Sequence, residues 1–418
     1  MRFVDGSGHA GYYFLRCRTV SRPEVPSLEG KYNNWPRYLG AYAYRQWIRK
    51  RIEGMVSWSA AGAVQPGCTA LIGMCHRLPD VLLGNLSCLN AASWPELTEA
   101  IVVVDSTEGC LPKGLEAAAQ AACTNFKVRF LYYSAKQAKL TEELCLPYVF
   151  SWLSWSIALS HCTTRSAMLH DYDALVLGDT LARRYYAFVE SGAAIQGVRW
   201  YQVNGITAED RLAGTFEAFL DVPWLRSFRP IQMFNQVGYA GGRSRDYDTL
   251  LDIQHRHTAV SRRTVIDMDE ESLVHPSQMI HQYTMFRRSP GSALPCFSIP
   301  MIPVFELLSG KQDALGTAAK RINAANGKIV DFFGDGARIN LAQLDTASVD
   351  WILKQIARVC MARQIGPFRD FADYGTALYK LAASPDDKAW LGDFTALQRT
   401  WIDQSRGLVR RDRDSGTS

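Results

Sequence analysis

Two aspartates, Asp171 and Asp173, stand within a largely apolar stretch that covers residues 168–179. The apolar residues on both sides predict a buried strand that ends in charge. Because side chains alternate along an extended backbone, both carboxylates would face the same way. Carboxylate oxygens are ligands that Mg²⁺ and Mn²⁺ prefer, with water and a diphosphate filling the remaining positions. The spacing therefore predicts a divalent-cation site, with a surface Asp-Tyr-Asp turn as the alternative.

The residues before this pair indicate how it is positioned. Residues 154–166 have the spacing of a helix with Trp155, Ile157, Ala158 and Cys162 turned inward. The order is then helix, strand and acidic pair, which puts the carboxylates at the carboxyl end of a strand. Ligands bind at that edge of open α/β sheets.

Upstream, apolar strands alternate with helices. Strands are expected over 68–74, 100–105 and 128–133, and helices over 80–89 and 114–122. This alternation predicts βαβ units and a mostly parallel sheet. Asp105 comes where the second strand ends, so it would lie on the same edge of the sheet as the acidic pair.

The ordered set of these motifs resembles a known family. The motifs occupy residues 69–77, 94–97, 101–107 and 169–175. In order and spacing they resemble GT-A fold glycosyltransferases of the large inverting family 2 type, over residues 66–300. The resemblance implies a Rossmann-like α/β fold with a mixed, mostly parallel sheet flanked by helices. It also implies transfer of a sugar, with inversion, from a nucleotide diphosphate sugar to an acceptor hydroxyl.

The resemblance extends to the residues that would bind the nucleotide. Asp105 would contact the base, and the turn after the first strand, with Met74, His76 and Arg77, would line the nucleotide pocket. Cys75-His76 stands where Tyr-Asn is more frequent in the family. The donor implied by the resemblance is a UDP- or GDP-sugar, and the acceptor is a glycan, a lipid-linked sugar or a small molecule.

The same resemblance suggests roles for the acidic pair. Asp171 and Tyr172 would contact the ribose or the sugar, and Asp173 would hold Mn²⁺ or Mg²⁺ together with Asp171. GT-A families often take a further metal ligand, frequently a histidine, from a later segment. His275 and His281 are the candidates here, and a structural histidine is the alternative for each.

Inverting transfer also needs a carboxylate that removes the proton from the attacking hydroxyl. Asp246 and Asp248 follow a glycine turn, and Asp269 belongs to a denser acidic cluster. Asp269 is placed first because of its position on the acceptor side in similar enzymes. The alternatives are that Asp246 or Asp248 caps a helix over 247–254 and that the acidic cluster is a solvated face.

Composition restricts the class of protein. The 418 residues include 46 basic and 41 acidic residues, and a net charge of +5 does not indicate a dedicated nucleic-acid binder. No apolar run is long enough for a transmembrane helix, and the first residues lack an apolar secretion segment, so a cytoplasmic protein is expected. Ten cysteines without a CxxC pair argue against a zinc or disulfide framework.

Three regions are expected along the chain. They are an N-terminal extension over 1–65 that packs on the core, a GT-A catalytic domain over 66–300, and a mainly helical region over 301–418 with a disordered tail. The glycines at 6–11 formally match GxGxxG, but no helix opens after them, so dinucleotide binding is rejected. The basic tail at 406–413 would give only weak attraction to anionic membranes.

The remaining elements follow from spacing and from helix-breaking residues. Helices are expected over 42–52, with outward arginines, and over 181–190, 314–325, 346–363 and from 384 onward; 193–199 is expected to be a strand and 297–308 an extended exit from the catalytic domain. Two other functions stay open. One is a sugar nucleotidyltransferase, and the other is a non-catalytic carbohydrate-binding protein of the same fold.

Overall fold

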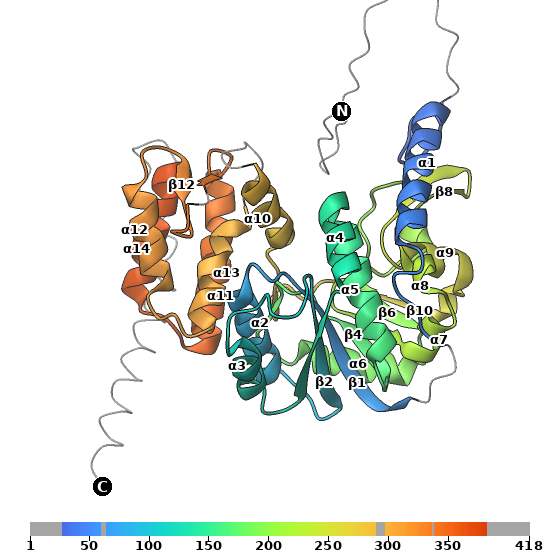
Figure 1. Ribbon diagram of the computed structural model, residues 1–418, viewed down its shortest axis with the longest axis horizontal. Helices are drawn as coiled ribbons and strands as arrows, with labels where there is room; N and C mark the ends of the chain where they lie inside the picture. The colour runs from blue at the N-terminus through green and yellow to red at the C-terminus, as the bar shows by residue number, and fades with distance from the viewer. Residues whose placement is uncertain (1–26, 60–63, 290–296, 337, 383–418) are drawn as a thin grey trace, which may run out of the picture.

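The computed structural model describes residues 27–59, 64–289, 297–336 and 338–382. At its centre is a seven-stranded sheet in the order β10-β6-β7-β4-β1-β2-β3 (Figure 1). Its strands are β1 (Gln65–Met74), β2 (Leu97–Val104), β3 (Lys127–Tyr132), β4 (Thr164–Leu169), β6 (Ile195–Val198), β7 (Ala218–Asp221) and β10 (Arg263–Ile266). β7 is antiparallel to β4 and β6, and the other neighbouring strands are parallel. The predicted α/β class with a mostly parallel, helix-flanked sheet is confirmed.

The central strands form because they are apolar along their whole length, as strands buried on both faces are. Alternate residues enter opposite cores: Ile72 and Val102 pack on one side of the sheet, and Leu71 and Ile101 pack on the other. β1, β2 and β4 run parallel, so their carboxyl ends meet at one edge. This edge carries the segments with the candidate site residues.

Helices cover both faces of the sheet. The first core includes residues of α2, α3 and α6, and the second includes residues of α5, α7, α8 and α9. These helices are α2 (Pro79–Ala91), α3 (Leu115–Ala122), α6 (Thr180–Ser191), α5 (Pro147–His161), α7 (Val222–Arg226), α8 (Pro230–Met233) and α9 (Leu251–His257). Pro79 opens α2, as predicted, because proline suits the first helical turn.

The C-terminal helices share the first core. Ile302, Phe305, Ile356 and Tyr374 belong to the same apolar cluster as Leu82 of α2. The elements are α10 (Met279–Arg288), α11 (Ile302–Leu308), α12 (Ala314–Ala324), α13 (Thr346–Arg363) and α14 (Phe368–Ala382), with the 3-10 turn Ile299–Met301 and the hairpin of β12 (Ile329–Asp331) and β13 (Arg338–Asn340). Figure 1 shows them standing beside α2. The described part of the predicted C-terminal region thus packs directly on the sheet domain.

One prediction for this region is wrong. Residues 297–308 are not extended but form the 3-10 turn and then α11. Pro300 and Pro303 both stand in the first turn of a helix, where the missing N–H is not needed. The two prolines therefore start helical turns and do not keep this segment extended. The helix predicted from residue 384 lies outside the described residues, as do the tail and the glycines at 6–11.

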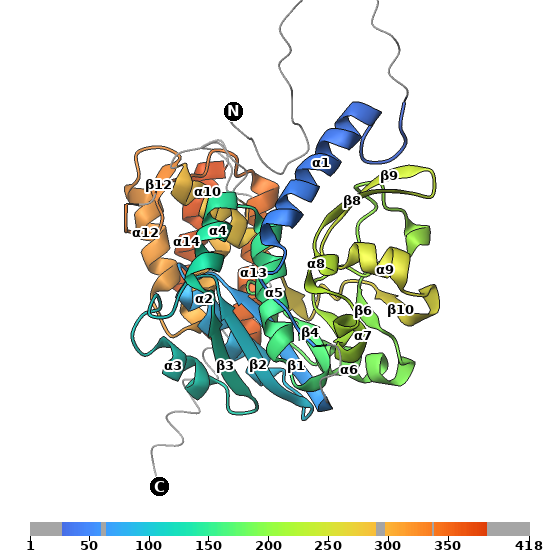
Figure 2. The same cartoon turned by 45° about the vertical axis from the view of Figure 1, so that its right-hand side comes forward.

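The N-terminal helix α1 (Trp35–Ile52) is longer than predicted, because Asn34 caps it and Pro36 lies in its first turn. It packs on a hairpin of β8 (Gln236–Ala240) and β9 (Arg243–Tyr247), as Figures 1 and 2 show. Its arginines do not all face outward. Arg45 is almost buried and forms an ion pair with Asp246 of the hairpin at 3.1 Å.

Three further boundaries differ from the predictions. The helix expected over 154–166 begins at Pro147 and ends at His161, and the sheet strand β4 begins at Thr164. α4 (Ala135–Leu144), which Ser134 caps, was not predicted. Tyr247 ends a strand instead of starting a helix.

The described residues contain neither a membrane-spanning helix nor a disulfide. None of their helices is long and apolar enough to cross a membrane. Their eight cysteines are all free, and most of them are buried.

Candidate metal and nucleotide site

The acidic pair lies in a tight turn that directly follows β4. The backbone N–H of Ala174 donates to the carbonyl of Asp171 at 3.0 Å. The side-chain amide of Asn85, which is buried in α2, donates to the same carbonyl at 3.0 Å and to that of Ala174 at 2.7 Å. The predicted extended backbone at this point is therefore wrong, because the strand ends at Leu169. The turn, and not strand alternation, brings the two carboxylates together.

A histidine far away in the sequence completes a three-residue cluster. The Nε2 atom of His275 lies 3.4 Å from Oδ2 of Asp171 and 3.3 Å from Oδ1 of Asp173. Among the described residues, these three form the one group of three or more side chains of metal-ligand type whose donor atoms all lie within 4.8 Å of one another. His281 is not part of it and lies on α10. β11 (Leu273–Val274) brings His275 here, because it pairs with β5 (Leu175–Val176), just after the acidic turn.

The pKa values of Asp171 and His275 are both shifted from their ordinary values. Burial, together with the neighbouring carboxylates of Asp173 and Glu217, raises the pKa of the Asp171 carboxyl to about 7 against the opposite effect of His275. Burial lowers the pKa of His275, but the hydrogen bond to Asp173 and the nearby carboxylates outweigh it and raise the pKa to about 9. Two acids with one shared imidazole have an excess of negative charge, as a cation site requires.

A short segment before β7 braces the cluster from two sides. The ring of Phe216 stacks on the imidazole of His275, with 4.2 Å between the centroids and 9° between the planes. Glu217 is fully buried and contacts Nδ1 of His170 at 2.8 Å. It also accepts a hydrogen bond from the backbone N–H of Asp171 at 3.3 Å. Phe216 and Glu217 were not among the predicted site residues, because one glutamate in an apolar segment has no distinguishing spacing.

Glu217 is held in an unusual backbone conformation. Its φ of +47° lies in the left-handed region, which non-glycine residues seldom occupy. Such a conformation persists only where the surrounding contacts enforce it, and it is found preferentially at functional sites. Here the contacts are those to His170 and to the backbone of Asp171.

Asp105 and the turn after β1 form the neighbouring part of the site. The Oδ1 atom of Asp105 lies 2.6 Å from Nδ1 of His76 and accepts a hydrogen bond from the His76 backbone N–H at 2.8 Å. The Asp105 backbone N–H donates to the carbonyl of Met74, whose side chain is buried in the core. Arg77 is more exposed and reaches Glu142 of α4 at 3.4 Å. Asp105 and His76 thus form one polar unit at the edge of the sheet.

Tyr172 connects this unit to the acidic turn. Its ring is buried, and its hydroxyl donates to the backbone carbonyl of Leu78 and lies 3.4 Å from that of Cys75. Both carbonyls belong to the turn that carries His76. Tyr172 therefore ties the turn after β4 to the turn after β1, and its buried hydroxyl is occupied by the backbone.

The two candidate bases in the β8–β9 region have different surroundings. Both carboxylate oxygens of Asp246 are engaged, one by Arg45 and the other by the hydroxyl of Tyr32 at 3.0 Å. Oδ1 of Asp248 accepts hydrogen bonds from the side chain of Asn235 and the backbone N–H of Thr249, both at 2.7 Å. Burial raises the pKa of the Asp248 carboxyl in spite of these bonds.

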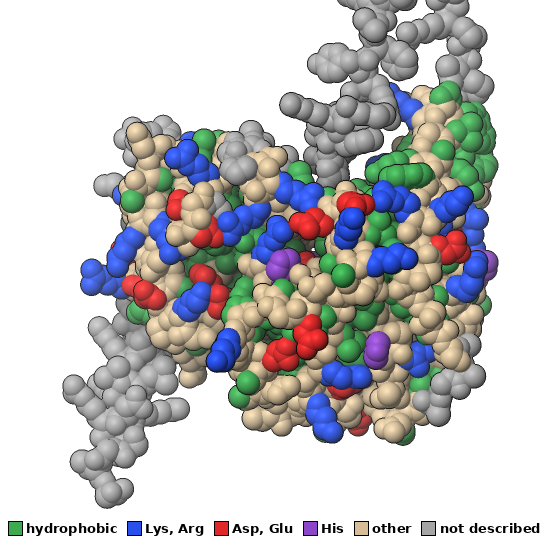
Figure 3. All heavy atoms as spheres, viewed as in Figure 1, with side chains coloured by type: hydrophobic (Ala, Val, Ile, Leu, Met, Phe, Trp, Pro, Cys, Tyr) green, Lys and Arg blue, Asp and Glu red, His purple; other side chains and the backbone are tan. Residues whose placement is uncertain are grey.

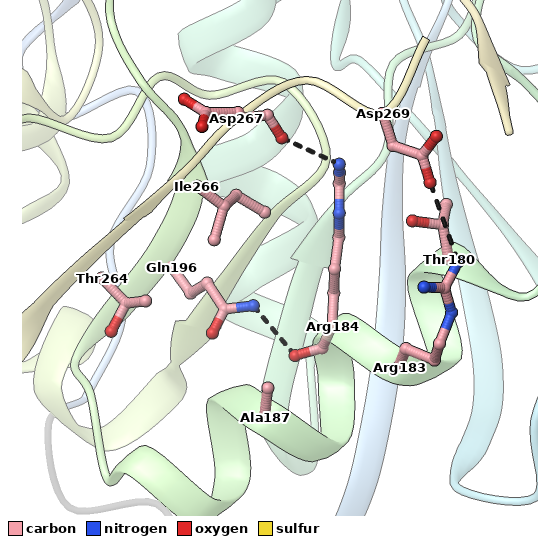
Figure 4. Close-up of a pocket in the computed structure, with 9 residues that line it drawn as sticks. All are labelled: Thr180, Arg183, Arg184, Ala187, Gln196, Thr264, Ile266, Asp267 and Asp269. Carbon is pink, nitrogen blue, oxygen red and sulfur yellow. Dashed lines mark hydrogen bonds and ion pairs between the residues drawn. The ribbon is translucent and has the colours of Figure 1, made fainter. Parts of the chain in front are cut away.

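Asp269 lies at a separate hollow of about 320 Å³ between α6 and the end of β10. Oδ1 accepts hydrogen bonds from the backbone N–H groups of Glu271 and Ser272 at 3.2 and 3.1 Å. Partial burial raises the pKa of this carboxyl, but hydrogen bonds from Thr180 and Ser272 outweigh it and hold the pKa below its ordinary value. Figure 4 shows the hollow, which is lined by Thr180, Arg183, Arg184, Ala187, Gln196, Thr264, Ile266, Asp267 and Asp269.

Comparison with known proteins gives only distant structural likeness. No protein-family model matches the chain, and no curated protein matches it. Among solved structures, TarS of S. aureus is similar at 12% identity over 75% of this chain and 90% of that one, with a TM-score of 0.33. The mannosyltransferase PcManGT of Pyrobaculum calidifontis, in complex with GDP-Man and Mn²⁺, is similar at 14% identity over 79% and 95%, with a TM-score of 0.30.

A third similar structure is the galactosyltransferase LgtC with donor and acceptor sugar analogues. It is 11% identical over 40% of this chain and 62% of that one, with a TM-score of 0.29. The TM-scores are all below 0.5. Function is therefore inferred from the geometry of the site itself.

Proposed function

We propose that this protein is a metal-dependent glycosyltransferase that moves a sugar from a UDP- or GDP-sugar to an acceptor hydroxyl with inversion. The observation that carries the proposal is the cluster of Asp171, Asp173 and His275 at the carboxyl end of β4. It stands one strand away from Asp105, because β1 lies between β4 and β2. Neighbouring strands are about 4.8 Å apart, so β4 and β2 lie roughly 10 Å apart, and the two parts suit the two ends of one nucleotide diphosphate sugar.

The cluster fits Mn²⁺ or Mg²⁺. Adjacent ligands of an octahedral ion at 2.0–2.1 Å lie about 3 Å apart. The donor atoms of His275 and the two aspartates are 3.3 and 3.4 Å apart, so small movements would complete such a shell. When bound there, a divalent cation would offset the negative charge that develops on the departing diphosphate. Mixed oxygen and imidazole donors favour Mn²⁺ somewhat over Mg²⁺.

The donor base is proposed to lie at Asp105 and the turn that contains Met74, His76 and Arg77. Oδ1 of Asp105 is occupied by His76, which fixes the orientation of the carboxylate. Arg77 is the exposed cation of this turn, and it is proposed to attract the diphosphate. Tyr172 is proposed to be a positioning residue, because its hydroxyl holds the base-binding turn next to the turn with Asp171.

Asp248 is proposed as the base that accepts the proton from the acceptor hydroxyl. A carboxylate base works best when its pKa is raised toward the working pH. Burial raises the pKa of Asp248, whereas hydrogen bonds lower that of Asp269, and Asp246 has both oxygens occupied. Oδ2 of Asp248 has no hydrogen bond among the described residues, so it is left to accept a proton.

The base assignment is tested by a set of isosteric variants. Asp248→Asn is expected to lower the rate of transfer about a hundredfold to ten-thousandfold with unchanged donor binding, because it removes one proton acceptor. Asp246→Asn and Asp269→Asn serve as matched controls and are expected to retain transfer within a few-fold. If Asp269→Asn instead loses transfer and Asp248→Asn keeps it, Asp269 is the base.

The donor is identified with the purified full chain and a panel of UDP- and GDP-sugars. Calorimetry with and without Mn²⁺ is expected to show nucleotide binding that requires the metal, followed by slow donor hydrolysis. Release of pyrophosphate from a nucleoside triphosphate and a sugar phosphate would indicate a nucleotidyltransferase. Glycan binding without nucleotide binding would indicate a non-catalytic protein.

A further inference from the structure

The helix α1 exposes an unusual set of large apolar side chains. In the part of the chain that the structure describes, thirteen large hydrophobic residues are exposed, and five of them lie on this one helix: Trp35, Leu39, Tyr42, Tyr44 and Trp47. Leu39 and Trp47 are 55% and 50% exposed. Single exposed apolar residues are ordinary on a soluble protein, but a contiguous group marks an interaction surface. Figure 3 shows this group along the upper right of the molecule.

The same helix is basic throughout. It contains Arg37, Arg45, Arg49, Lys50 and Arg51 and no acidic residue. Arg37, Lys50 and Arg51 are exposed on the same helix, and with the five apolar side chains they surround the side of α1 that is not buried. These eight residues are called the aromatic-basic face below.

The nearest exposed acids in the sequence do not offset this charge, because each is paired with an arginine of another segment. Glu29 lies 3.3 Å from Arg243, and Glu53 lies 3.6 Å from Arg229. The guanidinium of Arg51 contacts Glu143 at 2.9 Å and stacks over the ring of Trp47. Arg37 and Lys50 form no ion pair with any described residue.

The opposite side of α1 fixes its orientation. Ile48 and Ile52 are buried in the core beneath the helix, and Tyr38 packs with Leu28 and Val237. The nearly buried ion pair of Arg45 with Asp246 adds a polar anchor. Because these contacts hold the helix, it cannot turn its aromatic-basic face into the protein's own core. That face is directed away from the sheet domain.

We propose that the aromatic-basic face of α1 docks this protein on a bilayer surface that contains anionic lipids. Tryptophan and tyrosine favour the headgroup region of a membrane, where an apolar ring and a polar edge are both satisfied. Lysine and arginine around them match the anionic phosphates. An 18-residue helix is about 27 Å long, enough to lie flat along such a surface, and α1 is not apolar enough to cross it. This proposal does not depend on the metal site.

The proposal is tested by flotation of the full chain with vesicles. One set is phosphatidylcholine alone, and the other is phosphatidylcholine mixed with phosphatidylglycerol. Wild-type protein is expected to float only with the anionic vesicles and to be released by salt. Replacing Arg37 and Lys50 with alanine is expected to weaken binding roughly thirtyfold, since each such cation contributes about fivefold near an anionic leaflet.

A second variant tests the apolar part of the face. Leu39→Ala with Trp47→Ala is expected to lower binding on the order of tenfold, because less apolar area enters the interface. Matched controls on the far helices, Lys320→Ala and Trp351→Ala, are expected to bind as wild type does. Circular dichroism of each variant establishes that it is folded.

Three outcomes would overturn the proposal. The first is equal binding to both kinds of vesicle, or to neither. The second is that the control variants lose as much binding as the α1 variants. The third is a dimer in solution that Leu39→Ala with Trp47→Ala converts to a monomer, which would show that a second copy of the chain covers the face.

Discussion

Two acidic regions lie at the same edge of the sheet and differ in how their charge is satisfied. β10 is parallel to β6, so the carboxyl end that carries Asp269 points the same way as the end of β4. Asp269 receives backbone and hydroxyl hydrogen bonds, which lower its pKa. Asp171 and Asp173 share one histidine, and the pKa of Asp171 is raised to about 7. The carboxylate of the first region is satisfied by hydrogen bonds, whereas the second region is the one proposed to bind a cation.

The strongest test of this comparison removes a carboxylate from the second region. Asp173→Ala is expected to abolish Mn²⁺ binding and to lower transfer roughly a thousandfold, the equivalent of several kcal/mol of charge stabilisation. Mn²⁺ titration and donor turnover measure both effects. Asp373→Ala removes an exposed carboxylate from α14 and is the control, expected to behave as wild type does. Unchanged metal binding in Asp173→Ala would refute the metal role.

A smaller loss is expected when the support of the cluster is removed. Glu217→Gln keeps the shape of the side chain but weakens its hold on His170 and on the backbone of Asp171. Replacing a residue that orients a metal ligand typically lowers metal affinity ten- to a hundredfold. Mn²⁺ titration is expected to show a loss in that range, with the same donor preference. Glu99→Gln, which removes a carboxylate paired with Arg129 on the sheet, is the matched control.

Metal binding is expected to become tighter as the pH rises. At neutral pH the metal-free cluster holds a proton on His275, whose pKa is about 9, and part of one on Asp171, whose pKa is about 7. Binding must release these protons, about two at pH 6 and about one at pH 8. Calorimetry in buffers of different ionisation enthalpy measures the number. A pH-independent affinity would contradict the arrangement.

The same protons affect stability in the absence of metal. Both groups have pKa values above the ordinary 3.8 and 6.5, so the folded protein binds these protons more tightly than the unfolded chain does. The stabilisation from His275 is complete below pH 6.5 and is lost as the pH rises toward 9. The melting temperature of the metal-free protein is therefore expected to fall over that range, and His275→Asn should flatten the decline.

The smallest effect is expected in the first region. Asp269→Ala removes an acceptor for two backbone N–H groups, so it is expected to destabilise the protein by about 1 kcal/mol, as the loss of a cap does. Urea unfolding measures this, and Mn²⁺ affinity should not change. A loss of metal binding in this variant would remove the distinction between the two regions.

Periodic patterns were sufficient to predict much of the fold. The run of apolar residues in β1, the proline that starts α2 and the regular spacing of α13 all correspond to the observed elements. Apolar periodicity reports burial, and burial decides these elements. The acids at Asp105, Asp171 and Asp173 are predicted as site residues because they follow strands whose ends share one edge.

The rest of the site depends on contacts between distant segments. His275 is a candidate ligand from the family resemblance alone, and it meets the acidic pair because β11 pairs with β5 over two residues, which no periodic pattern predicts. Glu217 is one glutamate among apolar residues, and its backbone conformation is set by His170 and Asp171. Arg45 resembles its exposed neighbours in sequence, yet Asp246 draws it inward. The positions of these side chains are determined by tertiary packing and not by local sequence patterns.

The core shared by α2 and the C-terminal helices limits how the chain can be shortened. Gly84 of α2 lies so close to the backbone of Phe305 in α11 that an added β-carbon would approach it to 3.0 Å. In a fragment ending near residue 300, the side of α2 that packs on α11 would be exposed to solvent, next to the strands that carry the acidic turn. Insolubility of such a fragment would then reflect the loss of its C-terminal part of the first core, and biochemical work is better begun with the whole chain.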